Sequence, residues 1–212
     1  MRFAHSTAKM IRTGAVMRQV LLRFSLVLPM LGMLIPMMVG LSAPGNSSIQ
    51  QHMSELDLLS PWISLACRCG AIISGLSIAG FALALVLSKE SRMPFTAIMA
   101  AIFGFSMVSN GVFTMGSPLH GMYAIGLSII LVPALFAAES NRRDRIFVIV
   151  SCIALVYMWA LMTGVDPKPI HGLTQRIATI PMFEWFGYAS VVLLCRRKDG
   201  VSMAAKSVLD EV

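Results

Sequence analysis

At 212 residues the chain is long enough for one or two soluble domains. However, 57% of its residues are hydrophobic, only 13% are charged and the mean hydropathy is +0.77, which together exclude a soluble globular fold. The formal net charge of +7 is carried by short basic clusters between long apolar runs, so no folded groove for nucleic acid is expected. We expect membrane lipids as the partner of this charge.

Long apolar runs predict an all-α, polytopic membrane bundle of about six transmembrane helices. A span needs roughly 20 apolar residues, because each helical residue rises about 1.5 Å across a hydrocarbon core of about 30 Å. Six runs meet this requirement: Val20–Leu41, Trp62–Leu87, Phe95–Thr114, His120–Ala138, Ile146–Thr163 and Ile177–Cys195. The chain accordingly divides into a basic leader (1–19), a six-helix domain (20–195) and a tail (196–212).

The leader allows two interpretations. His5 and Arg12 fall on one side of a helix and Met10 largely on another, which is typical of a short helix lying on the inner leaflet. A disordered basic leader would explain the same residues. The first apolar run could also be a signal peptide, but its length and the proline at position 44 favour an uncleaved anchor.

The distribution of lysine and arginine predicts the orientation. All but three of the 17 basic residues lie on one side of the predicted bundle, in the leader, the second and fourth connections and the tail. The exceptions are Arg68, Lys168 and Arg176. The positive-inside rule then assigns the basic side, and both termini with it, to the cytoplasm.

Polar residues gather on the opposite, outer side. Ionisable groups are costly in hydrocarbon, so those near the ends and in the interiors of the predicted helices are candidates for a functional site. The candidate residues of an outer pocket are Arg68, Asn110, His120, Asp166, His171, Arg176 and Glu184. Topology alone brings them to one depth, with Glu184 expected in the first turns of the sixth helix and His120 at the start of the fourth.

The surroundings of Arg68 favour a position inside the bundle. Small residues follow it at steps of three or four, as at Gly75, and such a stripe lets membrane helices approach closely. We therefore expect Arg68 to pair with Glu184, Asp166 or Asp57. Alternatively, Arg68 and Glu184 reach toward lipid headgroups. The small residues could serve internal packing or dimerisation equally well, so a homo-oligomer stays open.

No metal and no cofactor are expected from the sequence. The cysteines at 67, 69, 152 and 195 form no CxxC pair. Two histidines, His120 and His171, are counted on the outer side and lack the HxxxH or HExxH spacing, which favours hydrogen bonding in loops over metal ligation. Seventeen scattered methionines indicate packing rather than copper binding.

Two short stretches carry a resemblance to a known family: NGVFTMGSPLHGM at Asn110–Met122 and HGLTQRI at His171–Ile177. With the six-span layout, the chain resembles bacterial membrane proteins of the domain of unknown function 998 family. It departs at Thr114, where that family typically has proline. The resemblance implies a multi-pass protein of the bacterial inner membrane and favours His120 and Arg176 at one site. It implies no activity and no catalytic residue.

Three functions are compatible with these residues. The first is binding or sensing of a small molecule or lipid in the outer pocket, because both charge signs cluster there without a catalytic motif. The second is an enzyme acting on lipid-linked substrates, with His120 or His171 as base and Arg68 or Arg176 holding a phosphate or oxyanion. The third is a small transporter, although no inverted repeat is visible. We rank them in that order, which leaves open whether the protein is an enzyme.

Overall fold

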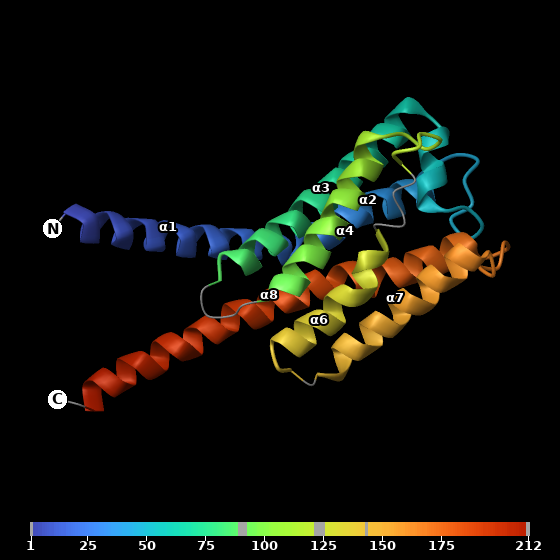
Figure 1. Cartoon of the computed structure of the whole chain (residues 1–212). Helices are drawn as coiled ribbons and strands as arrows, with labels where there is room; N and C mark the ends of the chain where they lie inside the picture. Colours follow the sequence, from blue (N-terminus) through green and yellow to red (C-terminus); the bar gives the residue numbers. More distant parts are fainter. Residues whose placement is uncertain (1, 89–92, 121–125, 143, 211–212) are drawn as a thin grey trace.

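The computed structural model describes residues 2–88, 93–120, 126–142 and 144–210. Side chains are described between residues 13 and 195. All regular secondary structure in these ranges is helical (Figure 1). The helices in chain order are α1 (Arg2–Ser25), α2 (Leu28–Ser42), η1 (Met53–Leu58), α3 (Pro61–Val86), α4 (Pro94–Val112), η2 (Leu127–Ile130), α6 (Leu131–Glu139), α7 (Arg145–Thr163) and α8 (His171–Asp210).

Five helical segments are long and apolar enough to cross a membrane: Thr13–Ser42, Pro61–Val86, Pro94–Val112, Arg145–Thr163 and His171–Cys195. The prediction of an all-α membrane bundle is therefore confirmed. The count of six spans is not, because the expected fourth span corresponds to the shorter apolar helix Leu127–Glu139, whose length is about 20 Å. Residues 121–125 of that expected span lie outside the described part of the chain.

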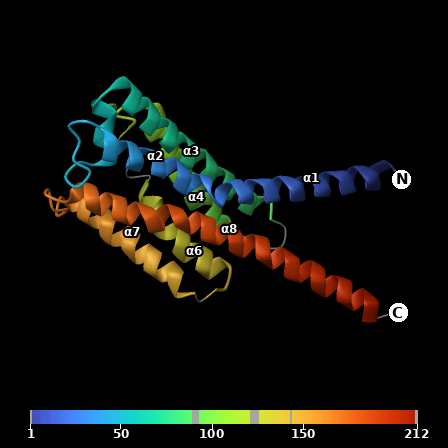
Figure 2. The same cartoon turned by 180° about the vertical axis from the view of Figure 1, so that it is seen from behind.

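The bundle has two different ends. Both termini lie at one end, and the connections before α3 and before α8 lie at the other (Figures 1 and 2). Helix α3 packs against α4, α2 and α1, and α8 packs against α7, α2 and α1, while α6 contacts both α4 and α7. Large apolar side chains such as Trp62, Phe105 and Trp159 are exposed on the outside, as expected for a surface in contact with lipid.

The first span is interrupted where α1 meets α2. Pro29 has no N–H and breaks the backbone ladder, and Val27 leaves the helical conformation with φ −127° and ψ −41°. Two hydrogen bonds tie this break to α3: Ser74 Oγ donates to Pro29 O at 2.7 Å, and Ser25 Oγ donates to Ser77 O at 2.9 Å. The break is therefore held by specific side-chain hydrogen bonds.

Helices α3 and α4 approach closely at two glycines. A Cβ atom on Gly75 would lie 2.6 Å from Gly104 O, and one on Gly104 would lie 2.8 Å from Gly75 O. Only residues without side chains fit at this crossing. The small residues that follow Arg68 thus serve packing within the bundle.

An aromatic cluster fills the centre of the bundle. The indole of Trp185 on α8 makes edge-on contacts with Phe81 of α3, Phe136 of α6 and Phe186, with ring centroids 5.1 to 5.9 Å apart. Such T-shaped pairs stabilise by roughly 0.5 to 1.5 kcal/mol beyond their buried area. Three helices are joined at one tryptophan.

Helix α4 begins with donors that a distant carboxylate satisfies. Glu139, at the end of α6, accepts hydrogen bonds from the N–H groups of Phe95 and Thr96 at 3.0 and 2.9 Å and from the Thr96 hydroxyl at 2.5 Å. The first N–H groups of a helix have no partner within it, and a negative charge there also complements the helix dipole. Glu139 therefore fixes α6 onto α4.

We predict that Glu139→Ala lowers the free energy of unfolding by about 1 to 2 kcal/mol, because the cap of α4 is lost. Glu139→Gln, which keeps an acceptor oxygen, should lose less. Chemical unfolding of the purified protein in detergent, followed by helical circular dichroism, measures both. An alanine variant as stable as the wild type would contradict this role.

Candidate functional site

A cavity of about 150 Å³ lies between the helices toward the end of the bundle opposite the termini. Its wall is formed by η1, α2, α3, α4, α7 and α8, so no single segment of sequence defines it. The apolar lining includes Met33, Met53, Met107, Met158, Met182, Phe103, Leu161 and Phe183. The polar lining is Ser54, Asp57, Arg68, Ser106, Asn110, His120, Tyr157, Gln175 and Thr179. The cavity is therefore amphipathic.

Three of the predicted site residues, Arg68, Asn110 and His120, line this cavity. The Arg68 guanidinium is held by the last turn of α4: its Nε donates to Gly111 O at 2.8 Å and its Nη2 to Val112 O at 2.7 Å. These are carbonyls without a partner inside α4, since a helix leaves its last four free. Arg68 thus caps the end of α4.

The predicted pairing of Arg68 with a carboxylate is wrong for the described residues. Glu184 is exposed on the outward side of α8, and the exposed residues around it, such as Ile180 and Val191, are apolar. The helix begins at His171 rather than Ile177, so Glu184 lies about 20 Å along it and not in its first turns.

Asp57 and His120 fix the polar end of the cavity. Asp57 accepts hydrogen bonds from Ser64 Oγ and, at 2.7 Å, from Met115 N, so it joins η1, α3 and the connection after α4. The ring Nδ1 of His120 lies 2.7 Å from Phe113 O. His120 itself is in a turn, and residues 121–125, where the expected fourth span would begin, lie outside the described part of the chain.

The amide of Asn110 stands out within this wall. Its Oδ1 atom is buried and receives no hydrogen bond from any described residue. A buried acceptor without a partner costs about 1 to 3 kcal/mol. The cost would be removed by a molecule in the cavity that donates to this oxygen.

Arg176 is placed differently from the other candidates. Its Nη1 donates to Ser48 O at 2.7 Å, Gln51 O at 3.0 Å and Gly172 O at 2.8 Å, which ties the connection after α2 to the start of α8. Arg176 is not among the described lining residues of the cavity. The pairing of His120 with Arg176 at one site is therefore not seen in the described part of the chain.

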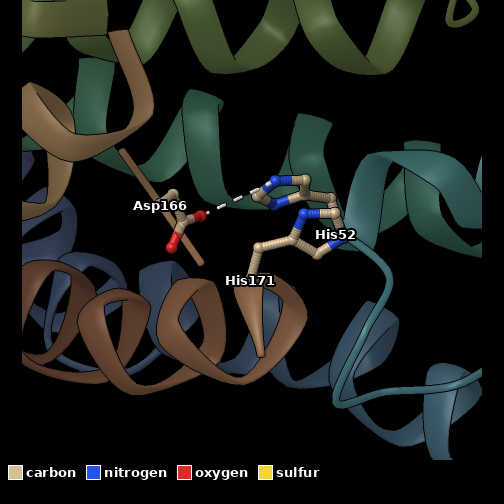
Figure 3. A group of neighbouring side chains, drawn as sticks. All are labelled: His52, Asp166 and His171. Atoms are coloured by element: carbon tan, nitrogen blue, oxygen red, sulfur yellow. Dashed lines mark ion pairs between the residues drawn. The ribbon is translucent and has the colours of Figure 1, made fainter. Parts of the chain in front are cut away.

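Asp166 and His171 belong to a second cluster, which also contains His52 (Figure 3). His52 Nε2 lies 3.9 Å from Asp166 Oδ2, and the two imidazole centroids are 4.2 Å apart. Burial, and then the neighbouring His171, lower the pKa of His52, while the nearby carboxylates oppose this shift. A neutral imidazole at neutral pH is thus favoured at His52.

His52 was not predicted, because only His120 and His171 were assigned to the outer side from the sequence. It precedes η1, in the same connection as Asp57, and the predicted topology already assigned that connection to the outer side. A full count of histidines in the outer connections would have found it. Nothing in the sequence predicts that five methionines line one cavity, because they come from η1 and four different helices.

The comparison with known proteins identifies the family. The sequence model of the family described as protein of unknown function (DUF998) matches residues 26–192, which is most of the chain. The chain belongs to this family. No curated protein and no solved structure matches it. Both stretches that carried the resemblance, Asn110–Met122 and His171–Ile177, fall inside the matched range. Because the family description assigns no activity, function has to be inferred from the cavity and the histidine cluster.

We predict that Arg176→Met releases the connection after α2 and lowers the free energy of unfolding by about 3 kcal/mol, because hydrogen bonds to a charged group are lost. Limited proteolysis should then cleave between residues 43 and 52. Lys168→Met, an exposed basic residue at the same end, is the matched control and should behave as the wild type. Equal cleavage of all three proteins would show that Arg176 does not hold this segment.

Proposed function

We propose that this protein is a membrane receptor that binds a small amphipathic molecule, or the end of a lipid, in the cavity between its helices. The observation that supports this most is the buried Asn110 Oδ1, which has no donor among the described residues and lies in the wall of a mostly apolar cavity. Ligand sites typically combine an apolar lining with a few polar groups that fix orientation.

The lining favours a ligand with a polar head and an apolar body. Arg68 uses Nε and Nη2 for helix carbonyls, which leaves Nη1 without a described partner and available to a carboxylate or hydroxyl. Asn110 Oδ1 would accept from a hydroxyl. The methionines around the rest of the cavity are flexible and polarizable, so they adapt to apolar groups of different shape.

The volume limits the size of the bound part. A cavity of about 150 Å³ is comparable to an engineered apolar cavity that holds benzene, so a ring or a short acyl segment fits, whereas a whole phospholipid does not. A larger ligand would have to leave its remainder outside. Simple probes of the right size are therefore octanol and octanoate.

We expect octanol or octanoate to raise the melting temperature of the protein in lipid nanodiscs, since a ligand at 100 times its dissociation constant adds about 2.7 kcal/mol. Arg68→Met and Asn110→Leu should abolish most of this shift. Gln50→Leu removes an exposed amide at the same end and should keep it. If neither probe stabilises the wild type, or if all variants respond alike, the cavity is not the binding site.

We also propose that the end carrying the termini faces the cytoplasm of a bacterial inner membrane. The support is the predominance of lysine and arginine at that end, where Arg142 and Arg145 flank the start of α7. The cavity would then open toward the outer side.

Cysteine labelling tests this orientation in a background without the native cysteines. A cysteine at Lys168 should react with a membrane-impermeant maleimide in intact cells. A cysteine at Arg142 should react only after permeabilisation. The reverse pattern would mean that the bundle is inserted the other way round.

A further inference from the structure

Three side chains from separate segments converge beside the cavity. His52 precedes η1, Asp166 lies in the connection between α7 and α8, and His171 is the first residue of α8 (Figure 3). One ligand atom from each, two imidazole nitrogens and a carboxylate oxygen, lies within 4.8 Å of the others. Around a tetrahedral zinc ion the ligand atoms are roughly 3.3 Å apart, because the metal–ligand distances are about 2.0 to 2.2 Å. Small side-chain rotations would close the difference.

The carboxylate shows that this is more than a chance grouping. The Asp166 side chain is only 8% exposed, and its Oδ2 atom is buried with no hydrogen-bond donor among the described residues. Its other oxygen, Oδ1, accepts from Thr174 Oγ1 at 2.8 Å. Thr174 therefore orients the carboxylate so that the unsatisfied oxygen faces His52. A cation at this oxygen would offset the cost of burying it without a partner.

Neighbouring groups also orient the imidazoles. The His52 ring hydrogen-bonds the side chain of Gln175, whose Oε1 accepts from Met53 N at 2.6 Å. Metal-ligating histidines commonly use the second ring nitrogen in this way. His171 Nε2 lies 3.9 Å from Glu55 Oε1, so a fourth protein ligand is within reach.

We propose that His52, Asp166 and His171 bind one divalent transition-metal ion of the zinc class at this end of the bundle. Two imidazoles with one carboxylate suit zinc and its neighbours, whereas calcium and magnesium prefer oxygen ligands alone. The three residues leave one coordination position for Glu55 or water. This site is separate from the cavity ligand and does not depend on it.

The ion would fasten three segments together. The η1 helix contributes Met53, Ser54 and Asp57 to the cavity wall, and His52 directly precedes it. A metal held by His52 and by both sides of the α7–α8 connection would therefore fix that wall onto α8. Gln175 contacts His52 and also lines the cavity, so it connects the proposed metal site to the cavity wall.

The test uses the full chain, purified without a histidine tag, stripped with a chelator and titrated with zinc chloride against a fluorescent zinc indicator. The wild type should bind one zinc ion per chain. Asp166→Asn and His171→Ala should each weaken binding about 100-fold or more, and Thr174→Val about 10- to 100-fold through loss of orientation. His5→Ala, a histidine in α1 at the other end, should bind as the wild type.

A second measurement needs only the wild type and so does not depend on the folding of variants. X-ray absorption of the zinc-loaded protein should give nitrogen and oxygen ligands at about 2.0 to 2.2 Å with imidazole scattering. A sulfur ligand would overturn the assignment. Two results of the zinc titration would also overturn the assignment. One is a wild type that binds zinc no better than the His52→Ala, His171→Ala double variant. The other is a loss of binding in His5→Ala equal to that in the site variants.

Discussion

A backbone inside hydrocarbon has to satisfy its own hydrogen bonds, and every other feature of this fold depends on that constraint. Helices meet it along their length, but their ends and breaks do not. The protein supplies side chains at these places: Ser74 of α3 at the break before α2, Glu139 at the start of α4 and Arg68 at its end. Three of the side chains that look functional in the sequence, Arg68, His120 and Arg176, thus bond to backbone carbonyls.

Polar side-chain atoms that have no partner after this backbone capping are the ones that indicate a binding site. Asn110 keeps an unsatisfied oxygen toward the cavity, and Asp166 keeps one toward two histidines. Both lie toward the end of the bundle opposite the termini, Asn110 in the last turn of α4 and Asp166 in the connection before α8. The structure thereby separates side chains that hold the fold from side chains that remain available to a ligand or an ion.

The cavity and the histidine cluster meet at Gln175. Its side chain lines the cavity, accepts from Met53 N and hydrogen-bonds His52. A shift of η1 would therefore change both places together. Close packing between the connection after α2 and the start of α8 limits such a shift, because Gly172 lies against the backbone of Gln51 with no room for a Cβ atom.

The sequence by itself determined that the chain is an all-α bundle with long apolar helices, because hydropathy is a property of a single chain segment. Only the tertiary structure decided which polar groups meet. Successive side chains of a helix point in directions about 100° apart, so a small change in position changes the face on which a residue lies. With α8 starting at His171 instead of Ile177, Glu184 lies about 9 Å further from the start of the helix. Glu184 therefore faces outward, Arg68 caps α4, and His52 joins His171 across about 120 residues of chain, a contact that no local pattern contains.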